Sequence, residues 1–282
     1  MKNKTREITQ ILKGVRSSDG DGVQLTRIIG SSELNLLDPF LLFDVFGSDK
    51  PQDYIGGFPP HPHRGFETVT YMLSGKMRHE DSAGNSGIIE PGGVQWMTAG
   101  KGIIHSEMPE QQQGLLSGFQ LWVNLPASQK MTEPKYQERT DEEVPVEQLG
   151  ENSHIKVIAG VTQEGTQGVI DNTTILPIYW HVQLEENTVF EQSIPSLHSA
   201  FIYVIKGQLL VGENSKKLST AELAVLSNAE NLIIKATTES QFLVIAGKPL
   251  NEPVERAGPF VMNTKAELRQ AFSDYETGRL TN

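Results

Sequence analysis

The segment HPHRGFETVTYMLSG, residues 61–75, leaves two interpretations open. It begins with two histidines around one proline, continues as a strand-like run of β-branched and aromatic residues, and ends at a glycine. Alternate side chains of an extended chain share a face, so His61 and His63 point the same way. The pair is either an ordinary turn that enters a sheet or one half of a metal site.

Working outward from this segment, glycine-rich turns separate short apolar runs throughout the chain, which predicts antiparallel strands. In the first half we expect strands at 66–73, 86–89, 94–98, 102–107 and 118–125. The second half repeats the layout, since YVIKG at 203–207 matches YMLSG at 71–75. The sequence therefore predicts an all-β protein made of two tandem β-barrels or β-sandwiches.

The predicted domains are residues 1–135 and 151–282, joined by a polar, acidic linker at 136–150. One helix is expected near the end of the chain, where apolar residues recur at helical spacing. Thr264 is its expected N-cap and Gly278 its expected stop.

The 282 residues carry a formal net charge of −11 and no cysteine. The charge argues against direct nucleic-acid binding, and the absence of cysteine excludes thiolate metal sites and thiol nucleophiles. No apolar stretch has the length of a membrane span, and the first residues do not form a signal peptide. We therefore expect a cytoplasmic protein without a membrane partner, in which any metal is held by histidines and carboxylates.

A second pair, His105 and Glu107, lies near the end of a later predicted strand. The same alternation puts these two side chains next to each other. Together with His61 and His63 they could supply three imidazoles and one carboxylate to a single ion. Such a ligand set suits Fe(II), Mn, Ni, Cu or Zn and leaves coordination positions open for a substrate.

Several long motifs closely resemble the pirin family, whose members are bicupins of the cupin superfamily. These motifs are GGFPPHPHRGFETVTYMLSG, HEDSAGNSG, QWMTAGKGIIHSEMP and FQLWVNLP, with LDPFLLFD before them and GPFVMNT near the end of the chain. The resemblance implies two jelly-roll-like cupin domains, followed here by the C-terminal helix. It also implies that His61, His63, His105 and Glu107 bind one divalent metal, for which Fe(II) is usual. Glu67 occupies the general cupin position for a glutamate ligand, and alternation counted on from His61 puts it on the face of the histidines. We expect it to support the site, although an exchange with Glu107 stays open.

The second repeat offers no comparable ligands. Counting from Gly207 as the histidines are counted from Gly75 reaches Ser193, Pro195, Thr237 and Glu239. We therefore expect the C-terminal cupin domain to lack a metal site.

Pirins show quercetin 2,3-dioxygenase activity, so the resemblance implies that a flavonol and O2 are the substrates and that CO is released. Glu107 would act as the general base that takes the proton of the flavonol hydroxyl. An alternative is an iron-dependent, redox-sensing protein that modulates a transcription regulator through protein–protein contact. A different cupin reaction, such as an isomerisation, is a third possibility.

A flat aromatic substrate needs apolar walls, and Phe58 and Met77 are the expected ones. Phe43, Phe46 and Trp96 are further candidates, each of which could equally be part of the core. Asp44 is expected either to hydrogen-bond a ligand imidazole and fix its tautomer or to cap a loop.

Overall fold

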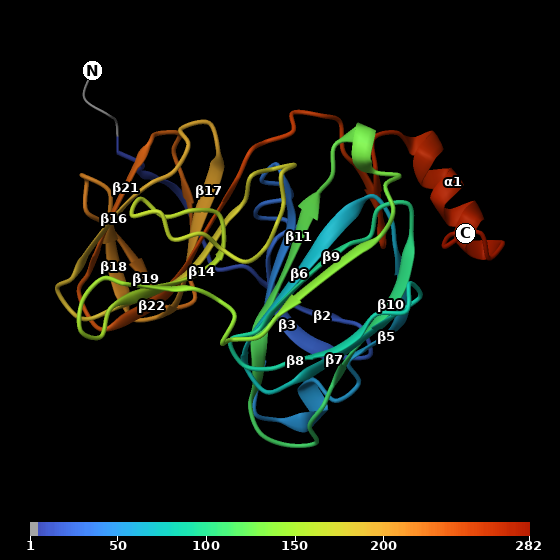
Figure 1. Cartoon of the computed structure of the whole chain (residues 1–282), viewed down its shortest axis with the longest axis horizontal. Coiled ribbons are helices and arrows are strands. Elements are labelled where there is room, and N and C mark those ends of the chain that lie inside the picture. The colour runs from blue at the N-terminus through green and yellow to red at the C-terminus, as the bar shows by residue number, and fades with distance from the viewer. Residues whose placement is uncertain (1–4) are drawn as a thin grey trace. The chain divides into compact units, whose positions relative to one another are not determined.

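The computed structural model describes residues 5–282. Within them the regular secondary structure is almost entirely β-strand, with one α-helix near the C-terminus (Figure 1). The chain divides into two compact units, each made from two separate stretches of sequence. The N-terminal unit contains residues 15–141 and 250–282, and the C-terminal unit contains residues 142–249 together with the described residues up to Gly14.

The N-terminal unit consists of two antiparallel sheets. In spatial order, the seven-stranded sheet contains β12 (Lys135–Arg139), β9 (Val94–Thr98), β6 (Phe66–Ser74), β11 (Leu116–Asn124), β4 (Phe40–Ser48), β3 (Val23–Ile29) and β2 (Val15–Asp19). The four-stranded sheet contains β5 (Phe58–His63), β10 (Ile103–Pro109), β7 (Met77–Asp81) and β8 (Ser86–Ile89). Two short 3-10 helices, η1 (Pro51–Asp53) and η2 (Ala127–Gln129), lie in the connections.

Apolar side chains from both sheets meet in the core of this unit. Phe46 of β4 and Met72 of β6 share one buried cluster with Met77 of β7 and Ile89 of β8. The two sheets therefore face each other as in a jelly roll, rather than closing into a continuous barrel.

Gly65 separates the histidine pair from the long strand that follows it. Its φ of +90° is favourable only for glycine, and a Cβ there would lie 1.9 Å from the carbonyl oxygen of Val261. The chain consequently leaves the four-stranded sheet after β5 and enters the seven-stranded sheet as β6.

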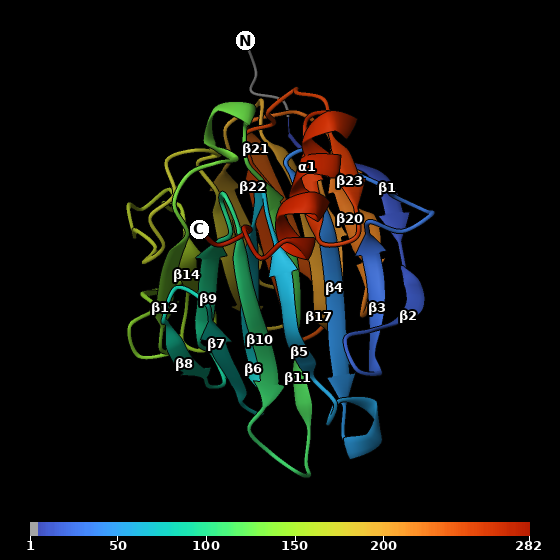
Figure 2. The ribbon, with the colours of Figure 1, turned by 90° about the vertical axis from the view of Figure 1, so that its right-hand side faces the viewer.

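The last part of the chain packs on the N-terminal unit. The hairpin of β23 (Glu255–Ala257) and β24 (Phe260–Met262) leads into α1 (Lys265–Glu276), and apolar residues of this segment pack with Ile104 of β10. Figure 2 shows α1 in front of these strands. The prediction for the helix ends is confirmed: Thr264 accepts a hydrogen bond from the backbone N–H of Glu267, and Gly278 takes φ +69° just after the helix.

The C-terminal unit has the same two-sheet plan around a large apolar core. Its seven-stranded sheet contains β1 (Ile8–Leu12), β20 (Leu223–Leu226), β17 (Ser199–Lys206), β22 (Ser240–Gly247), β15 (Ile178–Leu184), β14 (His154–Ala159) and β13 (Val146–Gln148). Its four-stranded sheet contains β16 (Val189–Ser193), β21 (Asn231–Ala236), β18 (Gln208–Val211) and β19 (Lys216–Ser219). The all-β prediction of two jelly-roll-like domains with a C-terminal helix is thus confirmed.

The units differ from the predicted boundaries at three places. β1 pairs with β20 of the C-terminal unit, and α1 belongs to the N-terminal unit. The predicted linker at 136–150 is largely structured, since β12 pairs with β9 and β13 pairs with β14. β12 and β13 are short strands at sheet edges with mainly polar side chains, so they lack the apolar alternation by which strands are recognised. No helix within residues 5–282 combines the length and apolarity needed to cross a bilayer.

Candidate metal centre

Three neighbouring strands of the four-stranded sheet build the site. β10 lies between β5 and β7, and His105 is opposite both His61 and Asp81 in the register. Because alternate residues of a strand share a face, His61 and His63 of β5 point to the same side as His105 of β10. Ligand atoms of these three histidines all lie within 4.8 Å of one another, so the three imidazoles converge on one region.

The proton positions of His61 and His63 follow from their second ring nitrogens. Nδ1 of His61 lies 2.8 Å from the carbonyl oxygen of Pro59, and Nδ1 of His63 lies 3.3 Å from that of Pro259. Carbonyl oxygens only accept, so each Nδ1 carries the proton and each Nε2 is a bare lone pair. These two Nε2 atoms are 3.0 Å apart, an arrangement that needs a positive charge between them.

Two further residues, His79 and Asp81, determine which ring nitrogen of His105 carries the proton. Nε2 of His79 lies 3.0 Å from Oδ2 of Asp81, and both side chains are fully buried. The carboxylate accepts, so in a neutral His79 ring Nδ1 is free to accept from Nδ1 of His105 at 3.4 Å. Nε2 of His105 is then unprotonated, and it is buried with no hydrogen-bond partner within the described chain.

Burial keeps two imidazoles of the cluster, those of His63 and His105, neutral. Desolvation, together with the field of His61, holds the pKa of His63 well below 6.5. Desolvation and the neighbouring His63 and His61 do the same for the pKa of His105. Burial raises the pKa of Asp81, but hydrogen bonds from His79 and Asn85 outweigh it and hold that pKa below its ordinary value.

The three histidines therefore fit a metal ion on structural grounds. Three Nε2 lone pairs face one region, and each Nδ1 has a partner that fixes the tautomer, as is usual for metal-bound imidazoles. Neutral imidazole suits Fe, Ni, Cu and Zn, so the donor set narrows the choice of metal without deciding it.

Glu107 lies two residues beyond His105 on β10 and is 2% exposed. Thr70 donates to its Oε1 at 2.6 Å, and Gln120 donates to its Oε2 at 2.8 Å. These bonds hold both carboxylate oxygens at the wall of the cavity that His61 and His63 also line. In this position Glu107 can accept a proton from a molecule in the cavity. Its carboxylate is not part of the group of ligand atoms within 4.8 Å of one another, so its role as a metal ligand stays a prediction.

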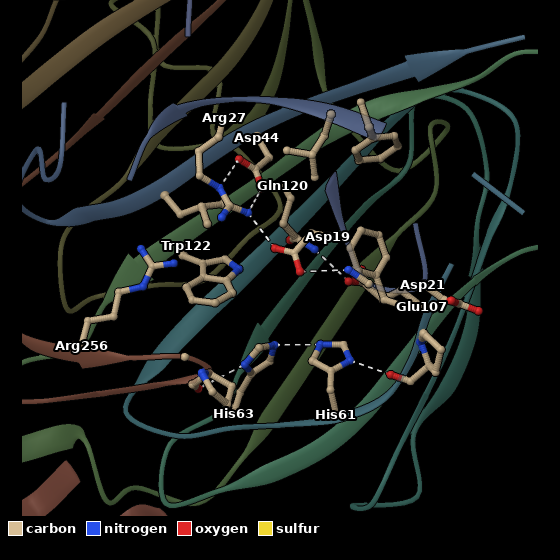
Figure 3. A pocket seen from close by; sticks show the side chains of 18 residues that line it. Asp19, Asp21, Arg27, Asp44, His61, His63, Glu107, Gln120, Trp122 and Arg256 are labelled. Atoms are coloured by element: carbon tan, nitrogen blue, oxygen red, sulfur yellow. Dashed lines mark hydrogen bonds and ion pairs between the residues drawn. The ribbon is translucent and has the colours of Figure 1, made fainter. Parts of the chain in front are cut away.

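The cavity beside the histidines has a volume of about 620 Å³, enough for a drug-sized molecule (Figure 3). Its apolar walls come from Phe46, Phe58 and Trp122, among others. Its polar lining includes an ion pair in which Arg27 donates to both oxygens of Asp44, at 2.9 and 2.7 Å. The complete set of lining residues lies within the N-terminal unit: Asp19, Gly20, Asp21, Leu25, Arg27, Leu42, Asp44, Phe46, Phe58, Pro59, His61, His63, Glu107, Gln120, Trp122, Arg256, Gly258 and Pro259.

Only some of the predicted pocket residues line the cavity. Phe58 and Phe46 line the cavity as expected, and Asp44 does too, although its partner is Arg27 rather than an imidazole. Met77 does not line the cavity; it is buried in the core cluster between the two sheets, a cluster from which Phe46 and Leu25 reach the cavity. Phe43 and Trp96 are fully buried and lie outside the cavity lining.

Glu67 does not line the cavity either. Thr98 donates to its Oε1 at 2.7 Å. Thr70, three residues further along β6, contacts Glu107, so alternation puts Glu67 on the opposite face of the sheet. The expectation that Glu67 shares the face of the histidines is wrong, because the turn at Gly65 ends the alternation that was counted from His61.

Sequence reasoning missed the pair His79 and Asp81. Both lie on β7, which was not among the predicted strands, yet their spacing is that of the pair His61 and His63. Alternation applied to HED at 79–81 would have put both side chains on one face. Trp122 and Gln120 gave no comparable signal, since polar and aromatic residues are common in any strand of a sandwich.

The two facing sheets in each unit and the buried histidine cluster at a cavity define a protein with two cupin-type domains. Models of two families, pirin and the pirin C-terminal cupin domain, match residues 22–123 and 179–281. A pirin-like protein of Caulobacter vibrioides is 47% identical over 97% of this chain and 99% of its own length. The chain belongs to the pirin family.

Two further similar proteins are named after an enzymatic activity. A Pseudomonas aeruginosa protein, provisionally named a quercetin 2,3-dioxygenase, is 46% identical over 98% of each chain. The crystal structure of quercetin 2,3-dioxygenase from Acinetobacter baumannii has a TM-score of 0.90 with 35% identity and covers 98% of each chain.

Proposed function

We propose that this protein is a metal-dependent dioxygenase of the quercetin 2,3-dioxygenase type, which opens the ring of a flavonol-like substrate with O2 and releases CO. The observation that carries the proposal is the convergence of the three unprotonated Nε2 atoms of His61, His63 and His105 beside a cavity of about 620 Å³. The similarity to proteins named quercetin 2,3-dioxygenase supports the choice among cupin reactions.

In this proposal His61, His63 and His105 hold one divalent ion, Fe(II) for preference, and Glu107 is the fourth ligand. The ion would supply Lewis acidity to a substrate hydroxyl and a route for electrons to O2. Thr70 and Gln120 orient the carboxylate of Glu107, so that one of its oxygens can take the hydroxyl proton of the substrate.

The cavity walls suit a flat aromatic molecule. Phe58 and Phe46 offer apolar surface, and the indole of Trp122 lies edge-on to His63 with 5.1 Å between ring centroids. A planar ring system against these side chains would be kept close to the histidines and shielded from bulk water, which strengthens the electrostatic interactions of Glu107.

The test is turnover of quercetin by the Fe(II)-loaded protein, in air and under anaerobic conditions. We expect O2 uptake and CO release in air only, and loss of both bound metal and activity in His63→Ala. His198→Ala is the matched control, since His198 belongs to the C-terminal unit and both its metal content and turnover should match wild type. Background turnover at full metal occupancy would refute the enzymatic proposal and favour an iron-dependent binding protein, while turnover that survives His63→Ala would refute the ligand assignment.

A further inference from the structure

Arg256 lies on the wall of the cavity without an acidic partner. It comes from β23 in the C-terminal segment, and its Nη1 donates to the carbonyl oxygen of Leu41 at 3.1 Å. This is the one hydrogen bond that its guanidinium forms with residues 5–282, and Asp44 and Asp19, the acids whose fields act on it, form their ion pairs with Arg27 instead. An arginine has five N–H donors, so most of the fork of Arg256 is available to a ligand.

Arg27, the other guanidinium in the cavity, is in the opposite situation. It forms a two-bond pair with Asp44, and its Nη2 also donates to Asp19 at 2.7 Å. Its charge is therefore neutralised by the protein itself. Burial and the nearby Arg27 lower the pKa of Arg256, and the fields of Asp44 and Asp19, which form no ion pair with it, oppose this only in part, so that a negative group in contact with Arg256 would stabilise its charged form.

Trp122 connects Arg256 to the histidine cluster. The guanidinium carbon lies 4.6 Å from the centroid of the indole, and the same indole contacts the ring of His63. Figure 3 shows these three side chains next to one another on one wall. A flat ligand lying along the indole could reach the histidines at one end and the guanidinium at the other.

We propose that Arg256 is an anion subsite, and that the substrates this cavity selects are hydroxyaromatic carboxylates, with the hydroxyl end at the histidines and the carboxylate on Arg256. This inference rests on the proposed function for the orientation of the hydroxyl end. A planar guanidinium already stacked on an aromatic ring is well suited to bind a carboxylate with two parallel hydrogen bonds. Quercetin, which has no carboxylate, would leave this subsite empty.

The test compares two small probes that differ by one carboxylate, catechol and 3,4-dihydroxybenzoate. Their binding to the Zn(II)-loaded protein is measured by calorimetry, so that no turnover is required. We expect the carboxylate probe to bind tighter to wild type, and Arg256→Gln to weaken it about tenfold or more, as loss of a charged hydrogen bond implies. Catechol binding should change less than about twofold by the same reasoning, and Arg256→Lys should retain part of the preference.

Arg269→Gln is the matched control, because Arg269 is an exposed arginine on α1, and it should bind both probes as wild type does. Equal weakening of both probes in Arg256→Gln would overturn the subsite, since Arg256 would then act only by packing Trp122. An unchanged preference for the carboxylate would overturn it as well. If Arg256→Gln abolishes the preference for the carboxylate probe but wild type does not turn over quercetin, the anion subsite stands and the proposed reaction fails. If quercetin is turned over but Arg256→Gln does not change the preference, the proposed reaction stands and the subsite fails.

Discussion

Replacing Asp81 with asparagine should invert the tautomer of a metal ligand through two imidazoles. Oδ1 of Asp81 accepts from the backbone N–H groups of Ala83 and Asn85, so the oxygen of the new amide will stay there. The amide nitrogen then replaces Oδ2 and donates to Nε2 of His79, while Nδ2 of Asn85 loses its bond to Oδ2 and keeps the one to Oδ1. The proton of His79 must move to Nδ1, and the proton of His105 must move to Nε2, the nitrogen that faces the cluster.

The magnitude follows from the bonds that metal binding must then break. To present a lone pair on Nε2, His105 has to give up the inverted arrangement, which disrupts two hydrogen bonds worth about 1 kcal/mol each. A loss of about 2 kcal/mol weakens metal binding about 30-fold. This value lies within the range of about 10- to 100-fold observed when partners of metal-bound histidines are removed.

The assay is a Zn(II) titration against a competing chelator, combined with 15N NMR of the histidine rings in the metal-free protein. We expect the Kd of Asp81→Asn to rise about 30-fold by the estimate above, and the NMR spectrum to show His105 protonated at Nε2. Glu80→Gln is the matched control, because Glu80 is an exposed acid on the same strand, and it should match wild type in both measurements. Protonation of His105 at Nδ1 in Asp81→Asn, or an unchanged Kd, would refute the proton assignment.

Three further predictions concern the site and its support. Glu107→Gln keeps the shape of the side chain but removes the base, so turnover should fall at least about 100-fold at equal metal occupancy; a smaller loss in a metal-corrected assay would exclude Glu107 as the base. Lys130→Met removes a buried ammonium that donates to three oxygens, and leaving these unsatisfied should lower the free energy of unfolding by about 3 kcal/mol in urea titrations, with exposed Lys135→Met as control. In the metal-free protein His63 and His105 stay neutral below pH 6.5 while their unfolded forms bind protons, so stability should fall on acidification by up to about 1.4 kcal/mol per pH unit for each histidine; a slope unchanged in the double asparagine variant would contradict this.

The histidine cluster could be predicted because its information is local. His61 and His63 lie two residues apart on one strand, as do His105 and Glu107. Alternation puts the two side chains of each pair on one face of their strand in any fold. The register between β5 and β10 then puts His105 opposite His61. The error at Glu67 has the same origin, because alternation holds only within one strand and the turn at Gly65 separates β5 from β6.

The second layer of the site could not be predicted in this way, because it depends on contacts far apart in the sequence. The carbonyl oxygen that fixes the tautomer of His63 belongs to Pro259, 196 residues away, and the free guanidinium of the cavity is Arg256. Both come from the segment 250–282, which the sequence assigns to the second domain but which packs on the first unit. This segment also supplies the acceptor Val261 for Lys130, whose ammonium binds Gly65 at the turn after the histidines. The segment 250–282 therefore orients the ring of His63, lines the cavity and supports the turn at Gly65. The N-terminal unit is incomplete without these 33 residues.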